Sequence, residues 1–530
     1  MASKKLAVIA LCVAAIIVLA GASVILRDDP LDGEPRTPGV HVTPPVTPPV
    51  TPPVTPPVTP PVTPPVTPPV TPPVTPPSTF GDVGPRGTYK ENQYDDPEDG
   101  VYVSTTGNDS TADGSIDKPY KSINAAISAA PPGGTVILRG GTYHEYNNVR
   151  FTKADLTLKS AKGEWAVIDF PLAHDPNIWK QTSAVRFDPN SSGSKLQGVE
   201  VIGGFYAVCL ETMWDWGQPD RSGASNIIIE DCILHDSRND TVKVKPNCDN
   251  VTIRYNEIYN SGREHISQSN FTAGERNAEG IDNVNGDNMR VQNNYIHDIC
   301  STGVYAKGGA KNALIENNLI ERAYAAGIMV GFDTSPEYFD SDNTSYYENF
   351  SCIVRNNLII DTGWEGIGMY ASVNAEICYN TIVNAVTYGT GKFHSPIYFG
   401  IATQDYDNWD GCPANISPNV HHNIICQPSA YAGRMIDIRY IVDFRFDSGG
   451  RRDLSALDGA LTINDNCYYL DGGTARFTDN RPPSPLTNAG LAAWKAHIGG
   501  DGSSIEADPE FDADYRPTNP LCADMGCRFA

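Results

Sequence analysis

The stretch Asn226-Ile-Ile-Ile-Glu-Asp-Cys-Ile-Leu-His-Asp236 decides the fold, because close copies of it return along the chain. Apolar and polar residues alternate inside each copy, which is the period of a β-strand with one buried face. The copies at 226 and 250 start 24 residues apart, as do those at 288 and 312, and the longer gaps contain insertions. The further copies begin at Asn250, Asn288, Asn312, Ser351, Asn374 and Ser417.

A repeat of this length indicates a stack of similar units, each of which buries its apolar face against the next. The unit is shorter than a propeller blade, which needs roughly 40 residues, and it lacks the helical pattern of leucine-rich or ankyrin repeats. We therefore expect an all-β fold, a right-handed parallel β-helix. In this solenoid each repeat makes one coil, and the insertions form long loops between coils.

One position of the repeat carries an amide side chain in nearly every copy. An amide offers donors and an acceptor, so amides stacked on successive coils can bond one another along the column. We interpret the column as a structural ladder and not as catalytic machinery. Its members are Cys232, Asn256, Asn294, Asn318, Asn357, Asn380 and Asn423.

The N-terminal residues 1–30 predict an export segment. Lys4 and Lys5 precede an unbroken apolar run from Leu6 to Leu26, which is long enough for one membrane span. The positive flank comes first, so the N-terminus stays inside and the rest of the chain is exported. We expect a membrane anchor, although cleavage near Ala20 would make the segment a signal peptide and the protein secreted.

Residues 31–85 predict a disordered, proline-rich stalk. Thr43 to Ser78 consists of nine tandem tetrapeptides, eight Thr-Pro-Pro-Val and one Thr-Pro-Pro-Ser. Proline fixes φ and removes hydrogen-bond donors, so this segment is expected to be an extended polyproline II spacer without a core. It would hold the folded body, residues 86–530, away from the membrane.

Both ends of the body resemble a known superfamily. Ser122 to Ala130 predicts a short amphipathic helix that caps the first coil, as the open end of a solenoid requires. The run from Tyr102 to Tyr143 resembles the opening of extracellular β-helix proteins of the pectate-lyase-like superfamily. Trp494, Asp508-Pro-Glu-Phe and Asp514-Tyr-Arg-Pro resemble their closing segment. The resemblance covers most of residues 100–530 and implies the fold, whereas fold alone does not imply a reaction.

The composition fits a protein outside the cytoplasm. The net charge of -24 argues against nucleic acid as a partner. Eight Asn-x-Ser/Thr sequences are candidate glycosylation sites. They begin at Asn108, Asn190, Asn239, Asn250, Asn270, Asn343, Asn349 and Asn415.

The twelve cysteines suggest a few disulfides and several buried thiols. Cys412 with Cys426, and Cys522 with Cys527, are close enough in sequence to pair outside the cell. Cys232 lies in the ladder and Cys378 lies on a predicted strand, where free buried thiols are expected. No Cys-x-x-Cys or Cys/His spacing indicates a zinc site.

Aligned coils bring acids and amines together. When the first strand of each coil is aligned on its inward aliphatic residue, the residues one and three positions later point outward. Adjacent coils are about 4.8 Å apart. We therefore expect one patch on a single outer face, built from Asp240, Lys243, Lys245, Glu279, Asp282 and Lys307.

This patch has the parts of a polysaccharide lyase. Asp240, Glu279 and Asp282 offer the oxygen ligands that Ca²⁺ prefers, and the ion would neutralise a uronate carboxylate and acidify the neighbouring proton. Ser301-Thr-Gly-Val-Tyr-Ala-Lys-Gly-Gly resembles the strand with the catalytic lysine in calcium-dependent β-helix pectate lyases of the family-nine type. Lys307 is the matching residue. The match departs at Thr302, where the family has an aspartate.

Lys243 and Lys245 are the other candidate bases. The alternative to a catalytic patch is a solvated face of ion pairs between coils. Aromatic residues in loops 332–350 and 386–413 either rim a sugar-binding groove or pack the loops onto the coils. We interpret His265, in the insertion 263–277, and His394 as structural.

We conclude from the sequence that the chain is an exported protein that acts on acidic polysaccharide or a cell-surface glycan, most consistent with β-elimination by a lyase. Two alternatives remain. One is a surface glycan-binding or adhesive protein without chemistry. The other is a different β-helix enzyme, such as an epimerase or a hydrolase, for which Glu279 and Asp282 could serve as the carboxylate pair.

Overall fold

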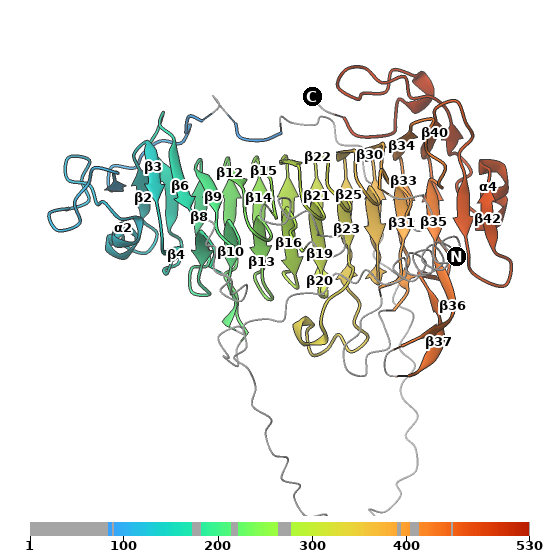
Figure 1. Ribbon diagram of the computed structural model, residues 1–530, viewed down its shortest axis with the longest axis horizontal. Coiled ribbons are helices and arrows are strands. Elements are labelled where there is room, and N and C mark those ends of the chain that lie inside the picture. The colour runs from blue at the N-terminus through green and yellow to red at the C-terminus, as the bar shows by residue number, and fades with distance from the viewer. Residues whose placement is uncertain are drawn as a thin grey trace, which may run out of the picture.

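Three long parallel sheets wind around one core, which confirms the predicted right-handed parallel β-helix (Figure 1). In this computed structural model each of these sheets has twelve strands within the described part of the chain, and successive coils follow one another along the long axis. The described residues are 83–86, 90–171, 182–213, 221–262, 277–388, 394–402, 413–446 and 449–528.

Sheet A receives the first strand of each repeat copy. Its inward residues, such as Ile229, Ile253 and Val291, are fully buried. The strands are parallel throughout. They are β1 (Val101–Val103), β2 (Thr135–Leu138), β5 (Thr157–Ser160), β8 (Lys195–Gln197), β11 (Ile228–Glu230), β14 (Thr252–Arg254), β17 (Arg290–Gln292), β21 (Leu314–Glu316), β25 (Ile353–Arg355), β29 (Glu376–Cys378), β33 (Asn419–His421) and β39 (Thr462–Asn464).

Sheet B receives the second strand of each copy, directly after the amide position. Its strands pair in parallel, and Leu234, Ile258 and Ile296 point into the core. They are β3 (Gly141–His144), β6 (Ala166–Phe170), β9 (Glu200–Gly203), β12 (Ile233–His235), β15 (Glu257–Tyr259), β18 (Tyr295–His297), β22 (Leu319–Glu321), β26 (Leu358–Ile360), β30 (Thr381–Val383), β34 (Ile424–Gln427), β40 (Cys467–Leu470) and β43 (Ile505–Glu506).

Sheet C carries the predicted site. It is parallel up to β41, and β42 closes it in the antiparallel sense. Its strands are β4 (Val149–Phe151), β7 (Val185–Phe187), β10 (Val208–Leu210), β13 (Val242–Val244), β16 (Ile281–Val284), β19 (Val304–Lys307), β23 (Ile328–Val330), β27 (Ile367–Met369), β31 (Ile397–Phe399), β35 (Ile436–Ile438), β41 (Phe477–Asp479) and β42 (Leu486–Ala489).

Shorter elements complete the described structure. A small parallel sheet contains β20 (Ala310–Lys311), β24 (Asn349–Phe350), β28 (Ser372–Val373), β32 (Asn415–Ile416) and β38 (Leu457–Asp458). An antiparallel hairpin pairs β36 (Tyr440–Arg445) with β37 (Arg451–Ser455). Two 3-10 turns are η3 (Pro336–Tyr338) and η4 (Pro520–Cys522).

The first residue of every repeat copy has a left-handed backbone. Its φ lies between 51° and 58° at all seven starts. Asparagine tolerates this region better than most residues, because its short polar side chain bonds locally. The recurring asparagine therefore marks a backbone bend that leads into sheet A. The seven starts are Asn226, Asn250, Asn288, Asn312, Ser351, Asn374 and Ser417.

The amide column forms the predicted structural ladder. The Nδ2 group of Asn294 donates to Asn318 Oδ1 at 3.0 Å and to the carbonyl of Ile253 at 2.9 Å. The same pattern repeats from Asn256 onward and extends to Asn466, which the sequence reading missed. Each of these amides is fully buried, so the ladder satisfies turn groups inside the stack.

Both ends of the core are capped. Helix α2 (Ile123–Ala129) buries Ile123, Ala126 and Ile127 against the first coils, as predicted. Helix α4 (Leu491–Ile498) closes the other end: Trp494 is fully buried, stacks on Phe477 with ring centroids 5.2 Å apart, and donates to Asp501 Oδ2 at 2.9 Å.

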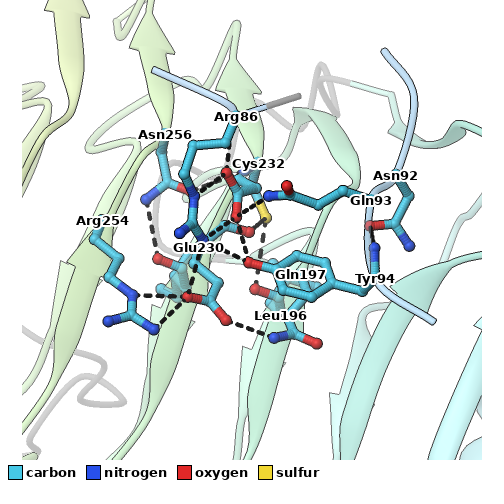
Figure 2. A network of polar contacts seen from close by, with 12 residues as sticks. Arg86, Asn92, Gln93, Tyr94, Leu196, Gln197, Glu230, Cys232, Arg254 and Asn256 are labelled. Carbon is cyan, nitrogen blue, oxygen red and sulfur yellow. Dashed lines mark hydrogen bonds and ion pairs between the residues drawn. The ribbon is translucent and has the colours of Figure 1, made fainter. Parts of the chain in front are cut away.

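A strap formed by residues 83–86 and 90–99 runs along the outside of the early coils (Figure 2). Gly84 N–H donates to the carbonyl of Asn293 at 3.0 Å, and Arg86 donates to both carboxylate oxygens of Asp231 at 3.0 and 2.7 Å. The predicted anchor and nearly all of the predicted stalk lie outside the described residues. Among those described, no helix has the length and apolarity to cross a membrane.

The cysteine and glycosylation expectations need correction. Cys522 and Cys527 are both free thiols: Cys522 Sγ lies 3.4 Å from Cys467 Sγ, whereas Cys527 packs elsewhere beneath Thr381. Cys412 lies outside the described residues. The buried free thiols predicted at Cys232 and Cys378 are confirmed. Three proposed glycan acceptors are buried in the folded body and cannot carry a glycan there, namely Asn239, Asn349 and Asn415.

Candidate active site

The register of sheet C brings the predicted site residues onto adjacent coils. Lys243 on β13 pairs in register with Asp282 on β16, and Val284 of the same strand pairs with Lys307 on β19. The glycines before β16 and β19, Gly280 and Gly303, allow close stacking of these coils. A Cβ atom at Gly280 would lie only 2.6 Å from the carbonyl oxygen of Gly303, so a larger residue would push the coils apart.

Three carboxylates converge at this place. Oxygen atoms of Asp240, Glu279 and Asp282 all lie within 4.8 Å of one another, and the three residues are 0, 0 and 1% exposed. The Lys243 ammonium forms ion pairs with Asp282 and, at 3.3 Å, with Asp240. The Glu279 backbone N–H donates to Asp240 Oδ1 at 3.0 Å. The three acids that sequence spacing placed on one face therefore form a single cluster.

Several oxygens of the cluster lack donors. Both carboxylate oxygens of Glu279 and Asp282 Oδ1 are buried and accept no hydrogen bond within the described structure, whereas Asp240 Oδ2 is buried with the Lys243 ammonium 3.3 Å away. Buried carboxylate oxygens are unfavourable without donors or a cation. Calcium takes six to eight oxygen ligands, so these four oxygens fit the protein share of such a site, with water or substrate supplying the rest.

The acids do not share one charge state. Burial raises the pKa of Glu279 well above its ordinary value, and the neighbouring carboxylates of Asp240 and Asp282 raise it further. Burial also acts to raise the pKa of Asp282, but Lys243 and Lys307 outweigh it and lower the pKa. Without a metal ion, Glu279 therefore tends to hold a proton beside an ionised Asp282.

The three candidate lysines have different partners. Lys307 is 2% exposed, and its Nζ atom lies 3.4 Å from the carbonyl oxygen of Asp333 and 5.0 Å from the centroid of the Tyr305 ring. Lys307 lies in register with Val284, two residues after Asp282 on β16, and Lys243 pairs directly with Asp282. Lys245 instead pairs with Glu211 at 3.1 Å on the neighbouring coil. Lys307 and Lys243 thus belong to the cluster and Lys245 does not.

The outer face is covered here, so it is not solvated, although ion pairs between coils are present, such as that of Lys243 with Asp282. The loop from Phe332 to Phe350 lies over the Lys307 end: Gly308 N–H donates to Glu348 Oε2 at 2.8 Å, and Asn285 Nδ2 donates to the carbonyl of Tyr338 at 2.7 Å. Tyr338 and Phe339 are buried, so they pack the loop onto the coils and do not rim an open groove.

A second acid on the same face was not singled out from the sequence. Glu365 occupies the position of Glu279 in a later coil and is also fully buried, but it accepts hydrogen bonds from the Tyr370 hydroxyl and His394 Nδ1, both at 2.6 Å. Trp364 stacks on His394 with ring centroids 4.9 Å apart. The column position was a signal for Glu365, whereas no spacing rule links it to a histidine in an insertion.

Part of the predicted surroundings cannot be placed. Arg263, Glu264, His265 and Arg276 lie outside the described residues, as do Phe393, Tyr406 and Trp409 of the later insertion. The described site offers three carboxylates, whose oxygens could hold a hard cation, together with the amine of Lys243.

Comparison with known proteins places this geometry among β-helix proteins. Residues 101–283 match the family described as Pel9A-like, right handed beta helix region, and residues 261–396 match a right handed beta helix region. Pectate lyase PEL9 of Emericella nidulans is 42% identical over 74 residues, which is 13% of this chain and 18% of that protein. The aligned part therefore spans less than a fifth of this relative.

Two solved structures share the architecture at low identity. Pectate lyase Pel9A is 15% identical, with a TM-score of 0.36, and the match covers 74% of this chain and 79% of Pel9A. The A-module of the mannuronan C-5 epimerase AlgE4 from Azotobacter vinelandii is 16% identical, with a TM-score of 0.43, and the match covers 73% of this chain and 95% of that module.

Proposed function

Because this chain is a right-handed β-helix protein of the pectate-lyase-like superfamily, with a Pel9A-like region at residues 101–283, we propose that it cleaves acidic polysaccharide by β-elimination. Lys307 is the base, and Asp240, Glu279 and Asp282 hold Ca²⁺. The observation that supports this assignment best is the convergence of three buried carboxylates, three of whose oxygens lack donors, on the face of sheet C that also carries Lys307.

The proposed β-elimination requires a base, and a group that neutralises the substrate carboxylate assists it. The base takes the proton from the carbon that bears the uronate carboxylate, a double bond forms to the next carbon, and the bond to the leaving oxygen breaks. A bound calcium ion would neutralise the substrate carboxylate and make that proton more acidic. As a general base, Lys307 must accept this proton on an unprotonated Nζ atom.

Lys243 has a different part in the proposal. Its ammonium is paired with two acids and its side chain is 13% exposed, so it is the most open amine of the cluster. It supplies positive charge where an acidic chain approaches a protein whose net charge is -24. We place the protein outside the cytoplasm, with residues 1–30 as its anchor or signal peptide and the proline-rich segment as its stalk.

The function is tested with the purified full chain on polygalacturonate, alginate and chondroitin, with and without Ca²⁺. Ultraviolet absorbance of the unsaturated product reports the reaction. Lys307→Ala is expected to lower kcat by about 10²–10⁴-fold, the range for losing a general base. Lys245→Ala is the matched control, because Lys245 is equally buried on the same face but pairs outside the cluster.

Full activity in Lys307→Ala would remove this base assignment, and the parallel Lys243→Ala variant would show whether the other amine of the cluster serves instead. Removal of calcium is expected to abolish product formation, and Asp282→Asn is expected to do the same at ordinary calcium concentrations.

The burial of the cluster favours a second candidate, a surface glycan-binding or adhesive protein without chemistry. All three acids and Lys307 are almost inaccessible in the described structure. A binding protein needs no access to them, and the predicted stalk would display its body at a distance. Retained binding to a glycan, together with no product from any uronate, would establish this candidate over the lyase.

A further inference from the structure

A different set of ligand-type side chains meets on the outer face of sheet A. Cys378 on β29 and His421 on the adjacent β33 are register partners, and Glu376 shares their face because it precedes Cys378 by two residues. The residues between them, Ile377 and Val420, point into the core. One ligand atom from each of Glu376, Cys378 and His421 lies within 4.8 Å of the other two.

The Cys378 thiol is buried at this meeting point. The residue is 0% exposed, it is a free cysteine, and no hydrogen bond reaches its sulfur within the described part of the chain. The His421 and Glu376 side chains beside it are each 15% exposed. A buried sulfur is therefore flanked by two polar groups that are open to solvent, which gives a small ion a way in.

The orientation of the His421 ring is set from outside the cluster. Its Nε2 atom lies 3.1 Å from Glu376 Oε1, and its Nδ1 atom lies 2.8 Å from Nδ1 of His422. A neutral imidazole carries one N–H. His421 can donate either from Nε2 to Glu376 or from Nδ1 to His422. In the second tautomer its Nε2 lone pair faces the Glu376 carboxylate, where a bound cation would satisfy both acceptors.

We propose that Glu376, Cys378 and His421 bind a divalent transition-metal ion of the zinc type, with His422 as a positioning residue. The set of one sulfur, one imidazole nitrogen and one carboxylate oxygen suits such an ion, whereas Ca²⁺ prefers oxygen alone. On binding, the metal–sulfur bond replaces the S–H bond and the thiol proton leaves to solvent. The fourth position remains open to water or another ligand.

The site could not be predicted from the sequence because its ligands come from different coils. No short spacing links Cys378 to His421, since a whole repeat and its insertion separate them. The stack brings them together through strand register. The bound ion would join β29 to β33 across the coil boundary. This proposal does not depend on the lyase, because it uses another sheet and another class of ligand.

The test uses the reduced, metal-free full chain titrated with Co²⁺, whose bond to thiolate gives a charge-transfer absorption band in the near ultraviolet. We expect the wild type to show this band, Zn²⁺ to displace it, and Cys378→Ser to lose it. Cys426→Ser is the matched control: Cys426 is a free, half-buried thiol on β34 of sheet B and lies outside the cluster. It should leave the band unchanged.

Further variants separate a designed site from a structural ion pair. His422→Ala is expected to keep the band but to weaken Co²⁺ binding about 10–100-fold, as loss of a partner behind a metal-bound histidine does. Asp282→Asn should leave the band unaffected, which separates this site from the acidic cluster on sheet C. If Cys378→Ser does not fold, His421→Gln, which should also weaken Co²⁺ binding, carries the test instead.

Absence of the band in the wild type, or its persistence in Cys378→Ser, would overturn the proposal. So would unchanged Co²⁺ affinity in His421→Gln. In each case Glu376 and His421 would be an ordinary ion pair beside an unrelated thiol.

Discussion

Glu279 and Glu365 occupy equivalent positions in their coils, and both are fully buried, yet their surroundings shift their pKa values in opposite directions. Glu279 faces two other acids and accepts no hydrogen bond, which raises its pKa. Glu365 accepts hydrogen bonds from Tyr370 and His394; burial acts to raise its pKa, but His394 outweighs burial and lowers it. A buried acid of the first kind is suited to a cation, and one of the second kind is satisfied by the protein itself.

This contrast predicts opposite effects of the same substitution. In the presence of a chelator, Glu279→Gln should stabilise the protein by about 1 kcal/mol, because an amide is neutral without taking up a proton beside the two other buried acids. Glu365→Gln should destabilise it by about 1–3 kcal/mol, because charge-assisted hydrogen bonds are lost. Denaturant unfolding measures both.

Added Ca²⁺ supplies the control for this pair. It should raise the stability of the wild type and of Glu365→Gln, but much less that of Glu279→Gln, because only the last variant changes the proposed ligand set. A Glu279→Gln protein that is less stable than wild type under chelation would contradict the reading of Glu279 as an unsatisfied acid.

At the residue scale, the sequence predicted the cluster through alignment of the coils. Asp240, Glu279, Asp282 and Lys307 meet because register follows from repeats of nearly constant length. What alignment could not predict is burial and partner choice. The loop over Lys307 belongs to an insertion, whose path is set by its own side chains and not by the repeat. The partner of Lys245, Glu211, lies before the coils that were aligned.

At the scale of single elements, the amide ladder joins the coils. Asn318 donates from Nδ2 to Val291 O and to Asn357 Oδ1, both at 2.9 Å, and its own Oδ1 accepts from Asn294. Asn288 belongs instead to an exposed row, in which its amide donates to Asn250 Oδ1 at 3.1 Å. The two rows run along the same stack and differ in burial.

Asn318→Ala is therefore expected to destabilise the protein by about 2–4 kcal/mol, since several buried groups lose their partners at once. Asn288→Gly should lower the free energy of unfolding by only a few tenths of the loss expected for Asn318→Ala. Glycine keeps the left-handed backbone, and water replaces the exposed hydrogen bond. Chemical denaturation of both variants checks the prediction. Equal losses would show that the buried ladder has no special role.

A ring stack on sheet B predicts a pH dependence. His235 stacks on Tyr259 with ring centroids 4.5 Å apart and contacts Asp236 and Glu200 at 3.0 and 3.2 Å. Burial acts to lower the pKa of His235, but the two carboxylates outweigh it and raise the pKa. The folded state therefore binds this proton more tightly than the unfolded chain, whose histidine pKa is about 6.5.

The direction of the pH dependence follows from this difference in pKa between the folded and unfolded states. The contribution of His235 to stability is fully present below the unfolded pKa and is lost as pH rises through the folded pKa. The free energy of unfolding, measured from pH 5 to pH 9, should therefore fall more in wild type than in His235→Gln. If the difference between the two proteins did not change with pH, the assignment to His235 would be wrong.

At the scale of the whole molecule, the solenoid and its first cap follow from sequence, because repeats and an amphipathic helix are local signals. The closing helix α4 was indicated only through a resemblance. The strap was not expected, since residues 83–99 carry no periodic pattern and their contacts are far away in sequence. Arg86 donates to Asp231, and Gly84 donates to Asn293.

The strap decides where the proposed stalk leaves the body. Because Gly84 is bonded beside Asn293, the proposed stalk would join the body on the flank of the solenoid and not at its capped end. Arg86 holds this place: it donates to Asp231 and to the Tyr94 hydroxyl at 2.7 Å and lies 4.0 Å over the Tyr255 ring. Arg86→Ala should therefore speed hydrogen exchange in residues 90–99 by about tenfold, as loss of about 1.4 kcal/mol of local stability does.

Lys162→Ala is the matched control, because Lys162 pairs with strap residue Asp95 where both side chains are exposed. Exposed pairs contribute little, so exchange in the strap should not change in this variant. Exchange in the core strands should remain slow in both variants, since the ladder and the sheets are untouched. If Arg86→Ala left exchange in residues 90–99 unchanged, the strap would be held by its other contacts, and the point at which the stalk departs would not depend on the Arg86–Asp231 pair.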